Sequence, residues 1–426
     1  MDENVTNANA RSKPNNAVNV SRRYWWRVVA LCFVGWILIY ADRTILNPIQ
    51  QQIGTQFHIG NTQLGLVNSI FFLTYAICQI PFGVLGDKIG RRLVIMTGFV
   101  ILGVMTFFSG FAFSFGIFLL FRALAGASQG TYYGPQYALS TEAIPTKDLT
   151  LGTAIINSGM AFGTSGGYLL SSYLVLQKGM SWTSPFWIMA VPTIIVGILF
   201  YIILKEKVIR PEDQENEKKE QTVEADTKKV SLKDLFKKKN LVLAFILCFC
   251  SIYANFVILT WLPQFLQVER GFQGSSVGFI SSLVPWASIP GALLFARIYD
   301  KIKKTKMLIG FLVPVSLISV FGIAFVTNKS LLILLLIIYG LTGKLAIDPI
   351  LIAFVTKNSP RGSLSTALSA YNFIGMSGSI LAPYLTGWIS DQFGSMQIGF
   401  YLAAVLLLIG VILFMFTSDK KNARQL

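Results

Sequence analysis

Twelve long apolar segments, separated by polar ones, limit what this chain can fold into more than any other feature. A helix needs about 20 consecutive apolar residues to cross a bilayer. Segments of that kind lie near 24–46, 63–85, 93–113, 115–138, 150–174, 185–204, 241–264, 275–297, 307–327, 330–354, 362–389 and 396–417. Because backbone groups in lipid must be bonded within their own segment, each is expected to be a helix. The sequence predicts an all-α membrane protein with twelve transmembrane helices.

The composition supports this prediction. Of the 426 residues, 53% are hydrophobic and 13% are charged, whereas soluble domains are about 45–50% apolar. The first 23 residues are polar and lack the apolar core of a cleavable signal peptide, so the first apolar segment is expected to remain as an anchor. We expect a multi-pass protein that is surrounded by the lipid of a cell membrane. The expected membrane is the inner membrane of a bacterium.

The formal charge of +16 raises the question of a nucleic-acid partner, and the placement of the charges answers it. If the N-terminus is cytoplasmic, 30 of the 36 Lys and Arg residues fall in inside loops and their flanks. The other six divide between the outside loops and the spans: Lys178, Arg270 and Lys329, and Arg43, Arg122 and Lys344. This asymmetry is the positive-inside pattern. It predicts cytoplasmic N- and C-termini and no nucleic-acid partner.

The chain divides into two halves of six spans. A mixed-charge linker over 205–240 separates a first half, 24–204, from a second half, 241–417, with tails over 1–23 and 418–426. The motif "GDKIGRR" at 86–92 is echoed by "YDKIKKT" at 299–305, half the chain length away. Such an internal repeat is typical of transporters built from two pseudo-symmetric halves.

The sequence argues against several other classes of protein. The four cysteines lie in apolar runs and the chain has one histidine, so neither a metal site nor a cofactor is expected. No catalytic set of Ser, His and Asp and no phosphate-binding loop occurs, so an enzyme is not expected either. An ion channel is an alternative to a transporter. Single-channel currents, in place of saturable uptake, would identify it. The chain is expected to act as a monomer.

A few charged residues lie inside the spans, and they suggest a substrate. Arg122 and Gln129 stand two helical turns apart on one face, and Tyr40 and Arg43 share another face. An arginine in a bilayer costs about 2.5–3.5 kcal/mol unless it faces a partner or a polar space. Arg122 could alternatively pin backbone carbonyls between helices, and Tyr75 could simply pack between helices.

Guanidinium, phenol and amide groups together suit a carboxylate that carries hydroxyls. In the second half, polar side chains in apolar spans are suited to sugar hydroxyls. The candidate substrate residues are Tyr40, Arg43, Tyr75 and Gln129, and in the second half Tyr253, Asn255 and Asn372. Lys344 and Asp348 are four residues apart and form a candidate intramembrane pair.

The motif Gly86, Asp87, Gly90, Arg91 and Arg92 resembles the signature of the major facilitator superfamily. More narrowly, "YADRTILN", "FRALAGASQG", "TWLPQFLQVERG" and "NFIGMSGSILAPYLTGW" resemble its anion:cation symporter family of galactonate, hexuronate and glucarate transporters and sialin-type carriers. The resemblance covers essentially the whole chain. It implies the major facilitator fold, alternating access, and a cytoplasmic gate latch made by Asp87, Arg91 and Arg92.

The same resemblance assigns roles within the spans. Tyr40, Arg43 and Tyr75 match positions that bind the organic anion, whereas Asp42 and Arg122 match a proton-coupling network. The chain departs from the family at Gln129, where the proton-coupled sugar-acid carriers have a glutamate. An amide cannot titrate.

The expectation from the sequence is therefore a secondary transporter of a small organic anion, most simply a sugar acid of the hexonate, hexuronate or aldarate type. We expect uptake coupled to protons, with Asp42 as the titrating group. Three alternatives stay open: the pair Lys344 and Asp348 replaces the missing proton site, the protein is an anion exchanger or uniporter, or it exports a drug or metabolite.

Overall fold

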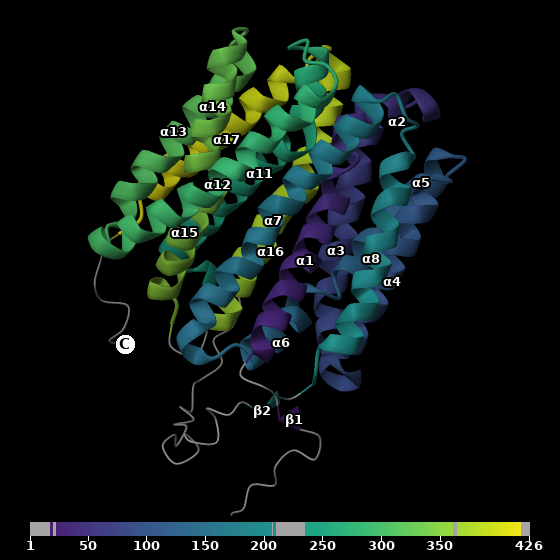
Figure 1. Ribbon diagram of the computed structural model, residues 1–426. Coiled ribbons are helices and arrows are strands. Elements are labelled where there is room, and N and C mark those ends of the chain that lie inside the picture. The colour runs from purple at the N-terminus through teal and green to yellow at the C-terminus, as the bar shows by residue number, and fades with distance from the viewer. Residues whose placement is uncertain (1–17, 20–22, 207, 210–234, 361–363, 419–426) are drawn as a thin grey trace, which may run out of the picture.

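The chain folds into long helices that run roughly side by side (Figure 1). The computed structural model describes residues 18–19, 23–206, 208–209, 235–360 and 364–418. The first half contains α1 (Tyr24–Thr44), α2 (Gln50–Phe57), α3 (Asn61–Ile89), α4 (Arg91–Ser109), α5 (Phe115–Gln129), α6 (Tyr133–Ala143), α7 (Leu149–Ser171) and α8 (Ser184–Ile203). The second half contains α11 (Lys239–Val268), α12 (Ser275–Ile302), α13 (Thr305–Phe325), α14 (Lys329–Thr342), α15 (Lys344–Asn358), α16 (Leu364–Phe393) and α17 (Gln397–Met415).

Short elements complete the described chain. Two 3₁₀ turns span Asn47–Ile49 and Thr146–Asp148, and a π-helical turn spans Ser172–Gln177. The two-residue strands β1 (Val18–Asn19) and β2 (Val208–Ile209) pair in parallel, so the chain before α1 lies beside the chain after α8. Both strands lie at the lower end of the bundle in Figure 1.

Helix is present at each of the twelve expected spans. Among the described residues, nine helices are both long enough and apolar enough to cross a membrane. The expected spans 115–138, 150–174 and 362–389 are helical but do not meet that criterion, because they are shorter or richer in polar residues. The chain is thus helical with many apolar spans, while the count of twelve crossings stays a prediction.

Two of the expected spans are broken where the sequence predicted one continuous helix. Span 115–138 is divided into α5 and α6 by a turn that begins at Gly130. Span 330–354 is divided into α14 and α15 at Gly343, which has an extended backbone. Pro135 lies in the first turn of α6, where the missing N–H removes no helical hydrogen bond. A break thus occurs in the fourth and in the tenth expected span.

Glycines let α7 approach α1 unusually closely. A Cβ atom added at Gly163 would lie 2.3 Å from the carbonyl oxygen of Ile37, and one at Gly159 would lie 2.5 Å from that of Phe33. Small residues at one-turn spacing are the usual way in which membrane helices pack backbone to backbone. The segment "NSGMAFGTSGG" is therefore a packing surface, and it fixes the position of α1, which carries the charged residues described below.

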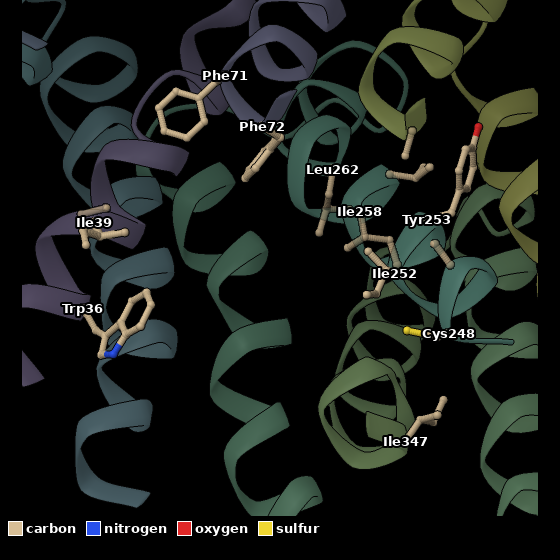
Figure 2. Close-up of a cluster of buried hydrophobic side chains, with 14 of the residues drawn as sticks. Trp36, Ile39, Phe71, Phe72, Cys248, Ile252, Tyr253, Ile258, Leu262 and Ile347 are labelled. Atoms are coloured by element: carbon tan, nitrogen blue, oxygen red, sulfur yellow. The ribbon is translucent and has the colours of Figure 1, made fainter. Parts of the chain in front are cut away.

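The two halves contact each other through α3 and α16 and through α7 and α12. Figure 2 shows buried apolar side chains from both halves, with Phe72 of the first half near Leu262 and Ile258 of the second. Phe72 of α3 and Phe256 of α11 meet edge to face, with ring centroids 4.7 Å apart.

Candidate functional site

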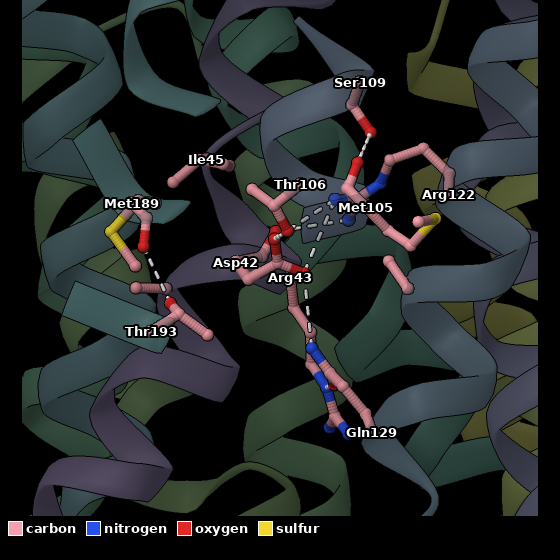
Figure 3. A network of polar contacts seen from close by, with 12 residues as sticks. Asp42, Arg43, Ile45, Met105, Thr106, Ser109, Arg122, Gln129, Met189 and Thr193 are labelled. Atoms are coloured by element: carbon pink, nitrogen blue, oxygen red, sulfur yellow. Dashed lines mark hydrogen bonds and ion pairs between the residues drawn. The ribbon is translucent and has the colours of Figure 1, made fainter. Parts of the chain in front are cut away.

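Asp42, two residues before the end of α1, has donors on three sides (Figure 3). The Nη1 of Arg122 in α5 lies 3.2 Å from its Oδ1, and the Nη2 donates to the Asp42 carbonyl over 3.2 Å. Thr106 of α4 donates its hydroxyl to Oδ1 over 2.7 Å, and Gln129 donates its Nε2 to Oδ2 over 3.2 Å. Both charged side chains are 1% exposed. The carboxylate is therefore fully compensated within the protein.

Arg43, the next residue, has a different environment. Its Nε donates to the Oε1 of Gln129 over 2.7 Å, and its guanidinium carbon lies 4.7 Å from the ring centroids of both Tyr40 and Tyr75. The side chain is 6% exposed, and its Nη2 is buried without a hydrogen-bond partner in the described chain. The structure shows no ion pair of Arg43 with any described carboxylate. A buried donor of this kind is costly unless something binds it.

Gln129, the last residue of α5, connects these two environments. Its amide oxygen accepts from Arg43, while its amide nitrogen donates to Asp42 and, over 3.4 Å, to the Ile39 carbonyl. Both functions of the amide are used, and they fix its orientation. The hydrogen bonds therefore join α1 to α5 through one neutral side chain that is 2% exposed.

In the second half, Lys344 and Asp348 form an ion pair on α15, with Nζ and Oδ2 2.9 Å apart. The hydroxyl of Tyr371 on α16 donates to the other carboxylate oxygen over 2.6 Å. The two charged side chains are 22% and 23% exposed. The pair carries no net charge.

The remaining candidates of the second half are less closely connected. Tyr253 is 1% exposed, Asn255 is half-buried and Asn372 is exposed. No hydrogen bond in the described part of the chain joins any of them to Arg43. The structure therefore brings together the candidates of the first half but not those of the second half.

The gate candidates lie where α3 ends and α4 begins. Arg91 pairs with Asp87 over 3.1 Å and with Glu142, near the end of α6, over 2.5 Å. The backbone N–H of Arg92 donates to Glu206, just after α8, over 2.7 Å. These described contacts join α3, α4, α6 and the segment after α8 to one another and do not reach the second half.

The opposite end of the bundle is joined across the halves. Asp391 of α16 accepts from the backbone N–H groups of Asn61 and Thr62 over 2.9 and 2.7 Å and from the Thr62 hydroxyl over 2.6 Å. Gln264 of α11 donates to the Asn61 side chain over 2.8 Å. Asp391 therefore caps the first turn of α3 from the other half, as an anion at a helix N-terminus does.

Sequence reasoning missed several of these partners. Thr106, Glu142, Glu206 and Asp391 bind charged or backbone groups of segments between 51 and 330 residues away. No spacing along one helix could reveal such pairs, although an acidic residue just after an apolar span is a usable signal for a helix cap. Among the described residues, no group of three or more His, Cys, Asp and Glu side chains could hold a metal.

Comparison with known proteins agrees with this architecture. The sequence profile described as Major Facilitator Superfamily matches residues 32–383 and 276–426. A hexuronate transporter of Bacillus subtilis (strain 168) is 26% identical over 89% of this chain and 91% of its own. A D-galactonate transporter of Escherichia coli O6:H1 is 23% identical over 96% of this chain and 99% of its own.

Among solved structures, the chain is similar to a bacterial homologue of the human lysosomal transporter Spinster, in an inward-facing and occupied conformation. The TM-score is 0.76 at 16% identity, over 93% of this chain and 97% of that one. The likeness shows the fold, and the profile match covers most of the sequence. The chain belongs to the Major Facilitator Superfamily.

Proposed function

We propose that this protein is a secondary transporter that carries a small organic anion across the membrane by alternating access. The substrate is a sugar acid, of the hexonate, hexuronate or aldarate type. Relatives of this protein are named as transporters of hexuronate, of D-galactonate and, as a probable assignment, of galactarate and D-glucarate. These names support a sugar acid as the substrate.

One observation carries the proposal. Arg43 lies in an apolar helix with its guanidinium between two tyrosine rings, no described carboxylate beside it and a buried, unpartnered Nη2. A planar guanidinium binds a carboxylate through two parallel hydrogen bonds. The carboxylate of the substrate is the partner that this arrangement lacks.

The rest of the substrate lies between the halves in this proposal. Tyr40 and Tyr75 flank Arg43, and their hydroxyls suit the hydroxyls of a sugar acid. From the second half, Tyr253, Asn255 and Asn372 would complete the contacts once the halves approach. Because these side chains lie on different halves, substrate binding would favour closure around the substrate.

The contacts between the halves support a specific conformational state. With the loop of Asp87, Arg91 and Arg92 in the cytoplasm, as the Lys and Arg distribution predicts, the end joined by Asp391 is the outer one. The outer end is then closed, and Asp87, Arg91 and Arg92 are not in contact with the described part of the second half. In the opposite state, Asp87, Arg91 and Arg92 would hold the cytoplasmic end closed. The protein would act as a monomer in the bacterial inner membrane.

Proton coupling through Asp42 and Arg122 stays a prediction. The site supports it in one respect, because Arg122 is the direct charge partner of Asp42. The compensation of Asp42 by three side chains supports the alternative, in which this carboxylate holds Arg122 and Gln129 in place.

Uptake into proteoliposomes tests the proposal. Purified protein would be supplied with labelled D-glucuronate, D-galactonate and D-glucarate, and with a lipophilic cation as the probe for drug export. The vesicles are preloaded with the unlabelled form of the same compound, so that a uniporter, a symporter and an exchanger would all be detected. We expect saturable uptake of at least one labelled sugar acid, and loss of that uptake in Arg43→Ala. Arg27→Ala, an exposed arginine on the same helix, is the matched control and should transport normally.

Other outcomes would reject the proposal. Transport of the cation with no sugar-acid uptake would favour an exporter, and single-channel currents would favour a channel. Normal sugar-acid uptake by Arg43→Ala would remove Arg43 as the carboxylate anchor.

A further inference from the structure

The charged side chains within the described apolar helices do not balance, and the excess charge is located on one residue. Asp42 is paired with Arg122, and Lys344 is paired with Asp348. Arg43 is left with a neutral partner, Gln129. Within the described spans, the empty site therefore carries one positive charge, on a guanidinium that is 6% exposed.

Gln129 keeps that charge uncompensated. Its side chain must accept a hydrogen bond from Arg43 and donate one to Asp42. A carboxylic acid can do both only while it is protonated, because an ionised carboxylate has no donor for Asp42. The amide is a neutral group of nearly the same shape, and it cannot lose a proton. The site is held permanently in the arrangement that a protonated acid would give.

From this geometry we infer that the protein is an obligatory anion exchanger, in which Gln129 sets the mode of transport by leaving the charge of Arg43 for the substrate to neutralise. The inference rests on the proposed function and goes beyond it. It specifies that the protein changes between its outward-open and inward-open states only when substrate is bound.

The physical reason lies in the occluded state through which any alternating-access carrier must pass. When both ends are closed, water no longer screens the site. An unpaired charge in such surroundings is strongly disfavoured, whereas a charge paired with a well-placed carboxylate is tolerated. The loaded carrier has a substrate carboxylate on Arg43 and no net charge at the site. The substrate-free protein has an unpaired guanidinium, so its passage through the occluded state back to the opposite side is slow.

The neighbouring titratable groups do not change this balance. Tyr40 and Tyr75, which flank the guanidinium, contribute aromatic rings and hydroxyl groups but no carboxylate. The carboxylate of Asp42 already faces Arg122, Thr106 and Gln129. Farther away, Asp348 is bonded to Lys344 and Tyr371. None of these groups is a free carboxylate that could compensate Arg43.

Proteoliposomes loaded with labelled D-galactonate or D-glucuronate, whichever is taken up, provide the test. Efflux is measured with and without the same unlabelled sugar acid outside. We expect efflux to be more than about tenfold faster with substrate outside, because an uncompensated charge raises the barrier for the empty carrier. A pH gradient should not drive accumulation into vesicles that contain no substrate.

Gln129→Glu is the diagnostic variant. The introduced carboxylate can pair with Arg43 when ionised and bind a proton when the substrate arrives, so the empty carrier can return. We expect net uptake to appear and to depend on the pH gradient. The efflux rate with substrate outside, divided by the rate without it, should fall towards one. Gln136→Glu adds a carboxylate at a buried glutamine that contacts Ser140 and neither Asp42 nor Arg43, and it should not change the mode.

The outcomes separate the two proposals. Equal efflux with and without outside substrate, or pH-driven accumulation by the unmodified protein, would overturn the exchanger inference while leaving the transporter intact. No movement of any sugar acid in either direction would overturn the proposed function itself. Because the comparison within the unmodified protein is decisive alone, a poorly folding variant would not leave the inference untested.

Discussion

The Nε of Arg43 donates to the Oε1 of Gln129 over 2.7 Å, so a neutral amide holds the guanidinium in place. The adjacent residue, Asp42, is instead bound by the full charge of Arg122. Two successive residues of one helix thus carry opposite charges with very different compensation. In the proposed function, the charge of Arg43 is left for the substrate, whereas the charge of Asp42 holds Arg122 and Gln129 in place.

Arg43→Lys should weaken substrate binding by at least about tenfold, although the charge is conserved. An ammonium cannot make the paired hydrogen bonds of a planar guanidinium or pack between two rings in the same way. Binding of the transported sugar acid by isothermal titration calorimetry measures the change. Unaltered affinity would show that the planar group is not needed.

Asp42→Asn should destabilise the protein more than it alters substrate affinity. Removing the carboxylate leaves Arg122 buried without its charge partner, and breaking a buried pair in this way costs about 3–5 kcal/mol. Thermal unfolding in detergent should show a clear loss of stability. Asp87→Asn is the matched control because its side chain is 65% exposed, where such a pair contributes about 0–1 kcal/mol. Equal stability of the two variants would contradict the structural role of Asp42.

Asp391→Ala should open the end of the bundle at which α3 begins. Its carboxylate receives three hydrogen bonds from Asn61 and Thr62, and all of them are lost. Spin labels at Thr55→Cys and Gln273→Cys, two exposed positions on different halves, would report the distance between the halves by double electron–electron resonance. We expect a larger population at long distance. An unchanged distance distribution would exclude Asp391 as a gate residue.

Gly163→Ala should destabilise the contact of α7 with α1 by about 1–3 kcal/mol, the usual cost of overpacking. The new methyl group would lie 2.3 Å from the Ile37 carbonyl oxygen, which belongs to the backbone and cannot rotate away. Gly166→Ala on the same helix meets no atom within 4 Å and serves as the control. Comparable unfolding temperatures for the two variants would contradict the close packing.

Local patterns predicted much of this architecture. The lengths of the apolar segments located the helices, and the seven-residue spacing of Arg122 and Gln129 placed both on one face, from which both bond to Asp42. The breaks at Gly130 and Gly343 could not be predicted, because glycine and proline also occur inside intact membrane helices. α12, for example, contains Pro285 and Pro290 without ending there.

Contacts between the halves were beyond the reach of the sequence for a different reason. Asp391 and Asn61 are 330 residues apart, and their meeting depends on how the two halves are docked. A repeat indicates that two halves exist but not which ends meet. The same limit applies to Tyr253, Asn255 and Asn372, whose distance from Arg43 changes with the docking of the halves.

The position of Asp391 has a consequence for the medium in which the protein works. Its contacts with Asn61 and Thr62 are exposed, and the attraction between a carboxylate and a helix N-terminus is weakened by dissolved salt. The buried charges of Asp42, Arg43 and Arg122 are largely shielded from that effect. Ionic strength at the end of the bundle that carries Asp391 should therefore act on closure and leave the binding of the proposed substrate almost unchanged.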